Sequence, residues 1–164
     1  MRESGGAALL LDYGDVTGGV PSLRGVRNHE FVDVLSMPGR SDITADVDFG
    51  AMRRAVEGLQ RMSGGGESSE GSEGAAVAAY GPVEQAHFLH QMGIGARMER
   101  LVHAAFEAAE GNGEEGEAKA QEEAGELVDA YNRLAGREEG QMGKVYKVFA
   151  IASEAHGTPV AFEV

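Results

Sequence analysis

The chain has 164 residues, a length that suits one domain and excludes a large multidomain enzyme. Its 27 acidic residues outnumber its 14 basic residues and give a formal charge of −13, which disfavours non-specific attraction to nucleic acid or anionic lipid. It contains no cysteine, which excludes thiol chemistry, and no apolar run approaches the roughly 20 residues of a membrane helix.

Most of the negative charge lies in two stretches, 63–76 and 107–126. The first stretch holds three glutamates and no basic residue, and the second holds eight glutamates and one lysine. Stretches rich in Ser, Gly and Glu bury too little apolar surface to offset the entropy of ordering them. We interpret both as solvated, low-complexity insertions rather than acidic binding faces.

The first element in the chain is an apolar run, Gly6–Tyr13, with the sequence GAALLLDY. A short apolar run between turn residues is typical of a strand buried on both faces, as in a parallel sheet covered by helices. The following stretch, from Thr17 to Gly39, has turn residues and no sustained period, so we expect it to be mostly loop.

A helix is expected from Phe49 to about Ser63, with Asp48 at its N-cap, because apolar residues recur at helical spacing. Val77–Tyr80 reads as a short strand. Pro82 suits the first turn of a second helix, and Gly93 suits its C-terminal end. The apolar positions of the two helices are Met52, Val56, Leu59, Val83, Ala86, Leu89 and Met92.

Two further amphipathic helices and a strand complete the pattern. One helix is centred on Leu101, and the other runs from Leu127 to a stop at Gly136. The sequence GKVYKVFAIA, Gly143–Ala152, favours a strand because it is rich in β-branched and aromatic residues. Strands alternating with helices indicate an α/β fold, but so few strands leave unpaired sheet edges. We therefore expect the chain to be part of a domain.

Two motifs that suggest chemistry have simpler explanations. Gly111–Gly116 fits the dinucleotide pattern G-x-G-x-x-G, but it follows a predicted helix and carries glutamates that would repel phosphate. His87 and His90 have a spacing that could place two imidazoles on one metal, yet no cysteine or H-E-x-x-H pattern accompanies them. We expect neither a dinucleotide site nor a metal site from these residues.

Residues 42–49, DITADVDF, are the densest chemical signal. In an extended segment Asp46 and Asp48 lie on the same side, where two carboxylates could bind a cation or a guanidinium. Alternatively, Asp48 only caps the following helix and Asp46 is solvated. Asp12 and Tyr13 close the first strand at the end where open α/β sheets place their ligands, although a plain turn explains them equally well.

Four segments in order resemble the MidA-like methyltransferases, the mitochondrial complex I assembly-factor family of S-adenosylmethionine-dependent protein arginine methyltransferases. They are GGAALLLDYG, LRGVRNHEFVDVLSMPGRSDITADVDF, GPVEQAHFLHQMGIGAR and MGKVYKVFA. The resemblance implies that residues 1–164 are the C-terminal part of a Rossmann-like class I methyltransferase sheet with flanking helices. The first strand would be the fifth of seven, and the last would belong to the antiparallel end.

The resemblance also implies an activity, namely S-adenosylmethionine-dependent arginine N-methylation of a protein, with a complex I subunit as the implied substrate. The family's cofactor-binding segment precedes the part that this chain resembles. We therefore expect the S-adenosyl-L-methionine site to lie mostly upstream and the isolated chain to be inactive. Mitochondrial location rests on the resemblance alone, since no targeting peptide is evident, and a homo-oligomer stays open.

Within this mechanism, the acidic residues gain a role in holding the substrate arginine. Asp46 and Asp48 would orient its guanidinium, and Tyr13 and Gln85 would line the pocket, with no metal required. One alternative is a truncated, non-catalytic paralogue that acts as a protein-interaction module. Another is a metal-dependent hydrolase that uses Asp42, Asp46, Asp48 and a histidine.

Overall fold

The computed structural model describes residues 6–17, 22–64 and 76–163, so the stretch at 63–76 lies mostly outside the described residues. The chain divides into two compact units. The first unit comprises Met1–Pro82 and Phe149–Ala155, and the second comprises Val83–Val148 and His156–Val164. Two long strands, β6 (Val77–Glu84) and β7 (Tyr146–Ser153), pass from one unit into the other.

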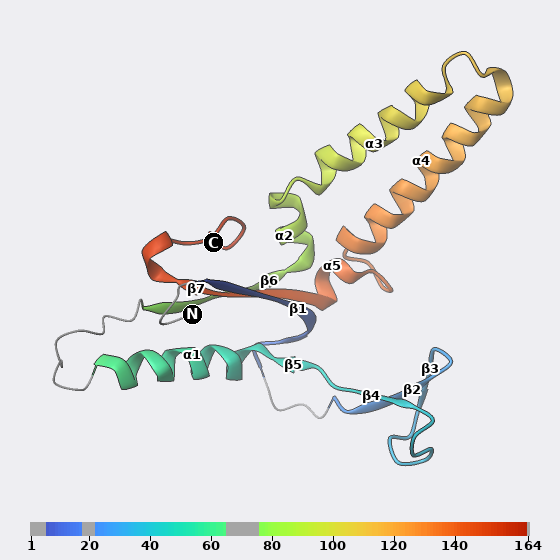
Figure 1. Cartoon of the computed structure of the whole chain (residues 1–164). Helices are drawn as coiled ribbons and strands as arrows, with labels where there is room; N and C mark the ends of the chain where they lie inside the picture. The colour runs from blue at the N-terminus through green and yellow to red at the C-terminus, as the bar shows by residue number, and fades with distance from the viewer. Residues whose placement is uncertain (1–5, 18–21, 65–75, 164) are drawn as a thin grey trace. The chain divides into compact units, whose positions relative to one another are not determined.

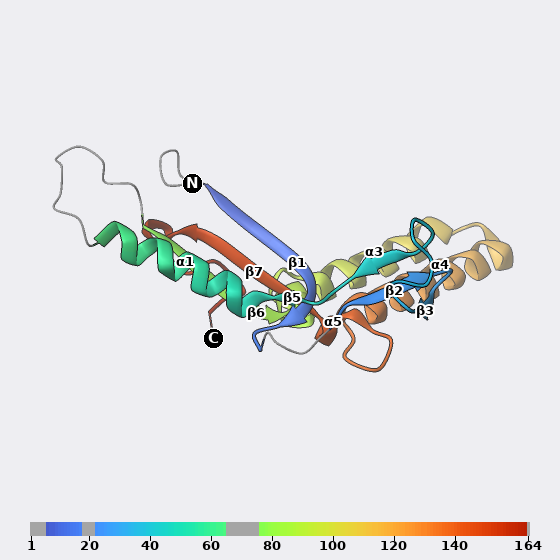
Figure 2. The same cartoon turned by 90° about the horizontal axis from the view of Figure 1, so that it is seen from below.

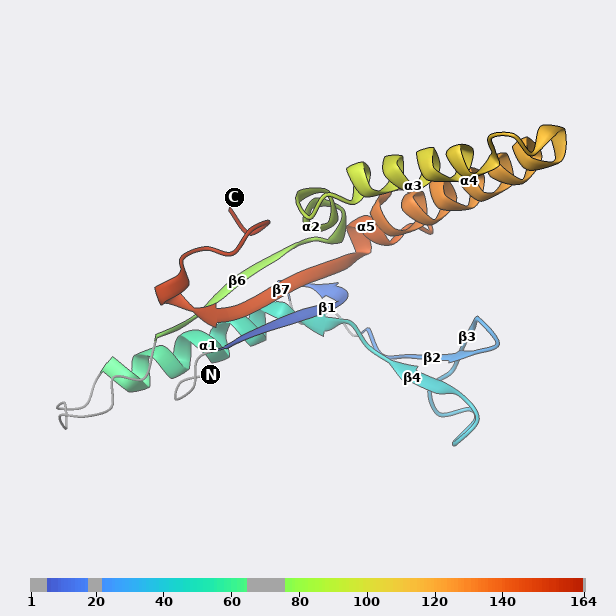
Figure 3. The same cartoon turned by 45° about the horizontal axis from the view of Figure 1, so that its top comes forward.

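The main sheet has four strands in the order β5-β1-β7-β6. Strand β1 (Ala7–Asp15) pairs in parallel with β5 (Val47–Asp48), with Gly14 opposite Val47 and Asp15 opposite Asp48. The helix α1 (Phe49–Gly64) follows β5 directly and runs along this sheet, as Figures 1 and 3 show. A sheet with a parallel pair and flanking helices confirms the predicted α/β class.

Strand β1 is correctly predicted, but its expected burial on both faces is wrong. Exposure alternates along the strand, and the side chains of Leu9 and Leu11 are 51% and 45% exposed. Alternation of this kind arises when one face of a strand is covered and the other is not. The leucine run thus reflects one covered face and one open face in the part of the chain that is described.

Helix α1 begins where the sequence predicts it. The Asp48 carboxylate accepts a hydrogen bond from the backbone N–H of Ala51, with an oxygen to nitrogen distance of 2.8 Å, so Asp48 is the N-cap. Phe49 is fully buried, and its ring lies 5.8 Å from the ring of Phe149 on β7. This aromatic pair anchors the start of the helix to the sheet.

The predicted loop after β1 contains a small antiparallel sheet, which corrects the sequence-based expectation. Its strands, in the order β3-β2-β4, are β2 (Arg24–Arg27), β3 (Glu30–Val32) and β4 (Asp42–Thr44). Asn28 and His29 form the two-residue turn between β2 and β3, with φ values of 49° and 65°. Turns with both central residues at positive φ match the twist of a tight hairpin.

The second unit is mainly helical and contains α2 (Gln85–Gln91), α3 (Ile94–Ala109), α4 (Gly113–Ala135) and α5 (Met142–Val145). Helices α3 and α4 lie side by side along their length (Figures 1 and 2). Gly93 ends α2 as predicted, with a φ of 82° that an L side chain disfavours. Pro82 lies in β6 rather than in a helix, because α2 begins only at Gln85.

The acidic stretch at 107–126 is largely helical. Most of it lies in α4, which begins at Gly113 and continues without a break to Ala135. Its glutamates are exposed, which agrees with a solvated stretch, while Ala120 is buried. Ala, Glu, Lys and Gln are strong helix formers, and the neighbouring α3 buries the alanine side.

The C-terminal strand begins three residues later than predicted, at Tyr146, because α5 precedes it. The short 3-10 helix η1 (Glu154–His156) follows β7, and the ring of Phe162 lies 6.1 Å from that of Phe88. None of the helices in the described part of the chain combines the length and the apolar character needed to cross a bilayer.

Candidate functional site

The candidate site lies at the C-terminal end of β1, where the parallel partner β5 approaches closely. Gly14 permits this approach, because a Cβ at this position would collide with the carbonyl oxygen of Val47. Tyr13 stands directly before this glycine, and its backbone N–H donates to the carboxylate of Asp12 at 2.8 Å. The close contact thus fixes the backbone that carries Tyr13 beside the segment that carries Asp46 and Asp48.

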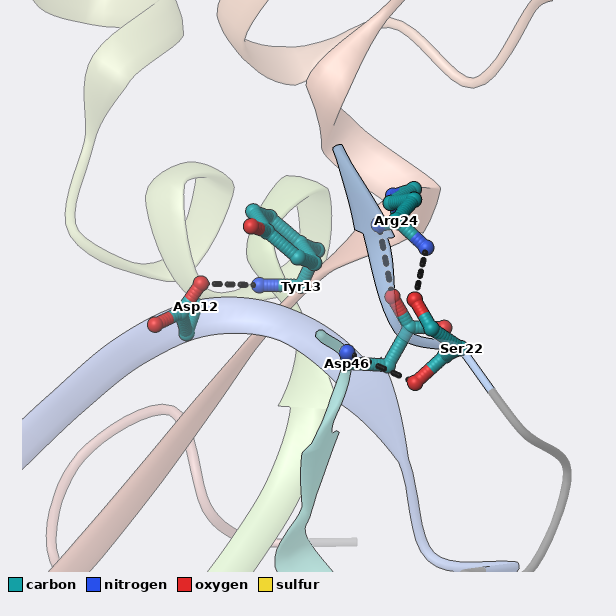
Figure 4. Close-up of polar contacts among 5 residues, drawn as sticks. All are labelled: Asp12, Tyr13, Ser22, Arg24 and Asp46. Carbon is teal, nitrogen blue, oxygen red and sulfur yellow. Dashed lines mark hydrogen bonds and ion pairs between the residues drawn. The ribbon is translucent and has the colours of Figure 1, made fainter. Parts of the chain in front are cut away.

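Four residues from three segments meet at this point, as Figure 4 shows: Tyr13 from β1, Ser22 and Arg24 from just before and at the start of β2, and Asp46 from just before β5. The guanidinium of Arg24 donates to the Asp46 carboxylate at 2.7 Å and to the Ser22 carbonyl oxygen at 3.2 Å. Its central carbon lies 5.1 Å from the centre of the Tyr13 ring. The Ser22 hydroxyl in turn accepts a hydrogen bond from the backbone N–H of Asp46 at 2.9 Å. We call these four residues the Arg24 cluster.

The Arg24 cluster combines the kinds of group that bind a guanidinium. A carboxylate and a carbonyl oxygen accept two of its N–H donors, and an aromatic face attracts its positive charge. The side chains of Arg24 and Asp46 are 33% and 46% exposed, so the guanidinium is accessible to water. The chain itself therefore presents an arginine to the carboxylate that the sequence singles out for arginine binding.

Asp48 lies on the neighbouring segment and makes contacts of its own. One carboxylate oxygen caps α1, and the other accepts a hydrogen bond from Arg54 at 3.4 Å. Both carboxylate oxygens of Asp48 thus have partners within the first unit. The alternative role of Asp48 as a helix cap is confirmed, and its role in substrate binding stays a prediction.

Gln85 belongs to the second unit, where it is 5% exposed at the start of α2. Its side-chain amide donates to the carbonyl oxygen of Leu134 at 2.8 Å. This bond ties α2 to the end of α4 and satisfies a buried amide. A pocket-lining role for Gln85 stays a prediction.

The two histidines of α2 differ in their hydrogen bonding. His90 bonds through one ring nitrogen to the Ala86 carbonyl oxygen at 2.6 Å and through the other to the Tyr131 hydroxyl at 2.9 Å. The Nε2 atom of His87 is buried without a hydrogen-bond partner in the described residues. No group of three or more potential metal ligands occurs in the described ranges, so the residues of the hydrolase alternative are not assembled there.

The G-x-G-x-x-G sequence at 111–116 joins α3 to α4 and runs into the first turn of α4. Gly116 packs against Asn112 and the Ala109 carbonyl, where a Cβ would collide with Asn112. Because the segment follows a helix and not a strand, it does not form the phosphate-binding turn of a dinucleotide site.

Arg24 and Ser22 are not among the site residues expected from the sequence. Arg24 stands 22 positions before Asp46, and no periodic pattern links residues at that separation. The sequence signal that could have found them is the acidic pair Asp46 and Asp48, because carboxylates close together favour a basic partner.

Comparisons with known proteins show what the chain is similar to. A family model described as "putative S-adenosyl-L-methionine-dependent methyltransferase" matches residues 1–65. The chain is 34% identical over 155 residues, 94% of its length, to the protein named protein arginine methyltransferase NDUFAF7, mitochondrial, of Xenopus tropicalis, of which it covers 29%. It is 40% identical over 107 residues to the mouse protein of that name, covering 65% of this chain and 21% of the mouse protein.

A homologue in Caenorhabditis elegans carries the corresponding name and is 35% identical over 148 residues, which cover 90% of this chain and 27% of the homologue. The chain therefore spans less than a third of the length of these relatives.

Proposed function

We propose that the chain belongs to the MidA-like family of S-adenosyl-L-methionine-dependent methyltransferases and that its protein is a protein arginine N-methyltransferase. The similarity carries this proposal, since it extends over 94% of the chain to a relative that is named as such an enzyme. The alternative of a non-catalytic interaction module has no observation of its own in the described residues.

The family implies S-adenosyl-L-methionine as the methyl donor. Among the residues that the structure describes, no glycine-rich turn leads from a strand into a helix, so this part does not fit the nucleotide end of that molecule. The roles proposed for this chain therefore concern the arginine substrate. The S-adenosyl-L-methionine site itself is proposed to lie mostly upstream of these residues.

The proposed role of Asp46 is to hold the guanidinium of the substrate arginine. A carboxylate fixes the plane of a guanidinium through charge-assisted hydrogen bonds and stabilises the positive charge that the methylated product retains. The 2.7 Å ion pair between Asp46 and Arg24 supports this role, because it places a guanidinium on the same carboxylate. Tyr13 is proposed to offer its ring face, as it does to Arg24.

Asp48 extends the proposed arginine pocket. Asp48 would contribute negative charge beside Asp46 while it continues to cap α1. The role proposed for Gln85 rests on its own side chain in the second unit, where the amide nitrogen donates to Leu134 and the amide oxygen is the group left to offer a ligand.

We also propose that the protein acts in mitochondria and methylates a subunit of respiratory complex I during assembly. The names of the relatives support the mitochondrial location. Complex I and the substrate subunit come from the family resemblance in the sequence.

The test is arginine methylation by the Asp46→Asn variant. Cells without the endogenous protein would express the wild-type protein, this variant or Glu57→Gln, a matched loss of one carboxylate in the exposed Arg61–Glu57 pair of α1. Transfer of tritium from labelled S-adenosyl-L-methionine to protein arginine is then measured with each immunopurified protein.

We expect Asp46→Asn to reduce transfer about tenfold or more, the effect of losing a charge-assisted hydrogen bond to the reacting group. Glu57→Gln should transfer at the wild-type rate. Unchanged turnover and unchanged arginine binding in Asp46→Asn would exclude its role, and no transfer by the wild-type protein would contradict the function.

A further inference from the structure

The arginine in the Arg24 cluster belongs to the chain itself. Its guanidinium contacts the Asp46 carboxylate and the Ser22 carbonyl oxygen, as drawn in Figure 4, and lies over the ring of Tyr13. These are the contacts that any arginine side chain would make at this site. A substrate arginine bound to Asp46 would need the position that Arg24 now fills.

The ion pair that holds Arg24 in the site is weak enough for the side chain to leave. Its side chain and that of Asp46 are 33% and 46% exposed, and ion pairs that water reaches are weak. Asp46 does not depend on Arg24 for its backbone position, because the Ser22 hydroxyl accepts the Asp46 N–H. The site would therefore keep its shape when the Arg24 side chain swings away.

We propose that Arg24 is an internal competitor, a pseudosubstrate whose guanidinium occupies the Asp46–Tyr13 site until a substrate arginine displaces it. This inference rests on the proposed function, since it takes Asp46 as the carboxylate that binds the substrate. Arg24 and Asp46 belong to one chain, so Arg24 competes at a fixed local concentration. An arginine with additional contacts to the protein then gains the site more readily, which favours a protein substrate over free arginine.

The size of the effect follows from the weakness of the pair. An exposed ion pair such as Arg24–Asp46 stabilises the occupied site only weakly. A substrate arginine that must displace Arg24 therefore binds with an apparent affinity roughly two- to sixfold lower than it would at an empty site. Removing the Arg24 guanidinium should restore that affinity. If Arg24 instead only braces Asp46, its removal would weaken arginine binding.

The experiment compares the full 164-residue chain with Arg24→Gln and with Arg61→Gln, a matched loss of one positive charge from the exposed Arg61–Glu57 pair. The probe is Nα-acetyl-L-arginine methylamide, and its binding is measured by NMR chemical-shift titration. We expect Arg24→Gln to bind the probe roughly two- to sixfold more tightly than wild type, and Arg61→Gln to bind as wild type. Adding Asp46→Asn to Arg24→Gln should abolish the gain.

A second variant, Arg24→Lys, guards against misfolding of Arg24→Gln, because lysine keeps the charge and lacks the planar fork. It too should bind the probe more tightly than wild type. Equal or weaker binding by folded Arg24→Gln and Arg24→Lys would overturn the proposal.

The methyl-transfer assay separates the two proposals. Tighter probe binding by the variants without any methyl transfer by the wild-type protein supports the guanidinium site and refutes the methyltransferase. Methyl transfer by the wild-type protein, combined with an unchanged or raised KM for the protein substrate in Arg24→Gln, refutes the competitor role and leaves the function standing.

Discussion

Two substitutions of Asp48 separate its role as a helix cap from its charge. Asn accepts the Ala51 N–H as well as Asp does at an N-cap, whereas Ala cannot. Asp48→Asn thus removes the charge and keeps the cap, and Asp48→Ala removes both. Comparing the two variants tests whether the hydrogen bond from Ala51 to Asp48 accounts for the contribution of Asp48 to stability.

The structure gives the expected magnitudes. Loss of the 2.8 Å cap bond should cost about 1 kcal/mol of the free energy of unfolding. The 3.4 Å pair with Arg54, whose side chain is 66% exposed, should contribute less than about 0.5 kcal/mol. Asp48→Ala should therefore be about 1 kcal/mol less stable than Asp48→Asn, a difference of about 2–4 °C in Tm for a chain of this size.

The assay is urea unfolding of the two variants and the wild-type chain, followed by circular dichroism, with titration of the arginine probe under native conditions. Equal loss of stability in Asp48→Asn and Asp48→Ala would refute the cap as the source of the effect. If Asp48→Asn folds as wild type and binds the probe less tightly, the charge of Asp48 serves arginine binding in addition.

Two further predictions concern the first unit. Phe149→Ala should cost about 3–5 kcal/mol in urea unfolding, because the ring is fully buried and packs on Phe49, and a loss below about 1 kcal/mol would contradict this packing. Gly14→Ala should cost about 1–3 kcal/mol or more, since its methyl group would collide with the Val47 carbonyl. Hydrogen exchange at the β1–β5 pair should then be faster, and wild-type protection would show that the strands do not approach so closely.

The elements predicted well from the sequence are those with long apolar periodicity. Helix α1 shows a stripe of apolar residues over its whole length, and Asp48 marks its start. Strands β2, β3 and β4 were missed because runs of three or four residues are too short to show a period. Their hairpin depends on Asn28 and His29 at positive φ, which residue types alone do not require.

The helical form of the acidic stretch was not part of the prediction. Its composition indicated a solvated insertion, and its glutamates are exposed, but Glu, Ala, Gln and Lys also favour a helix. The neighbouring helix α3 lies beside α4, in which Ala120 is buried. Packing against a distant partner is not visible in the composition of the stretch itself.

The candidate site was predictable only as a set of acids. Residues 42–49 point to carboxylate chemistry, and the cap at Asp48 follows from its place before the helix. The partner of Asp46 comes from β2, so the identity of the guanidinium in contact with it depends on the hairpin that the sequence analysis did not foresee.

The alternating exposure of β1 also has a colloidal consequence. Leu9 and Leu11 present a row of apolar side chains to solvent, and such rows on neighbouring molecules attract each other. At neutral pH the charge of −13 keeps molecules apart by mutual repulsion. Near the isoelectric point of about 4.7 this repulsion vanishes, so solutions of the chain should become turbid as the pH is lowered towards that value. Added salt screens the repulsion and should move the onset of turbidity to a higher pH.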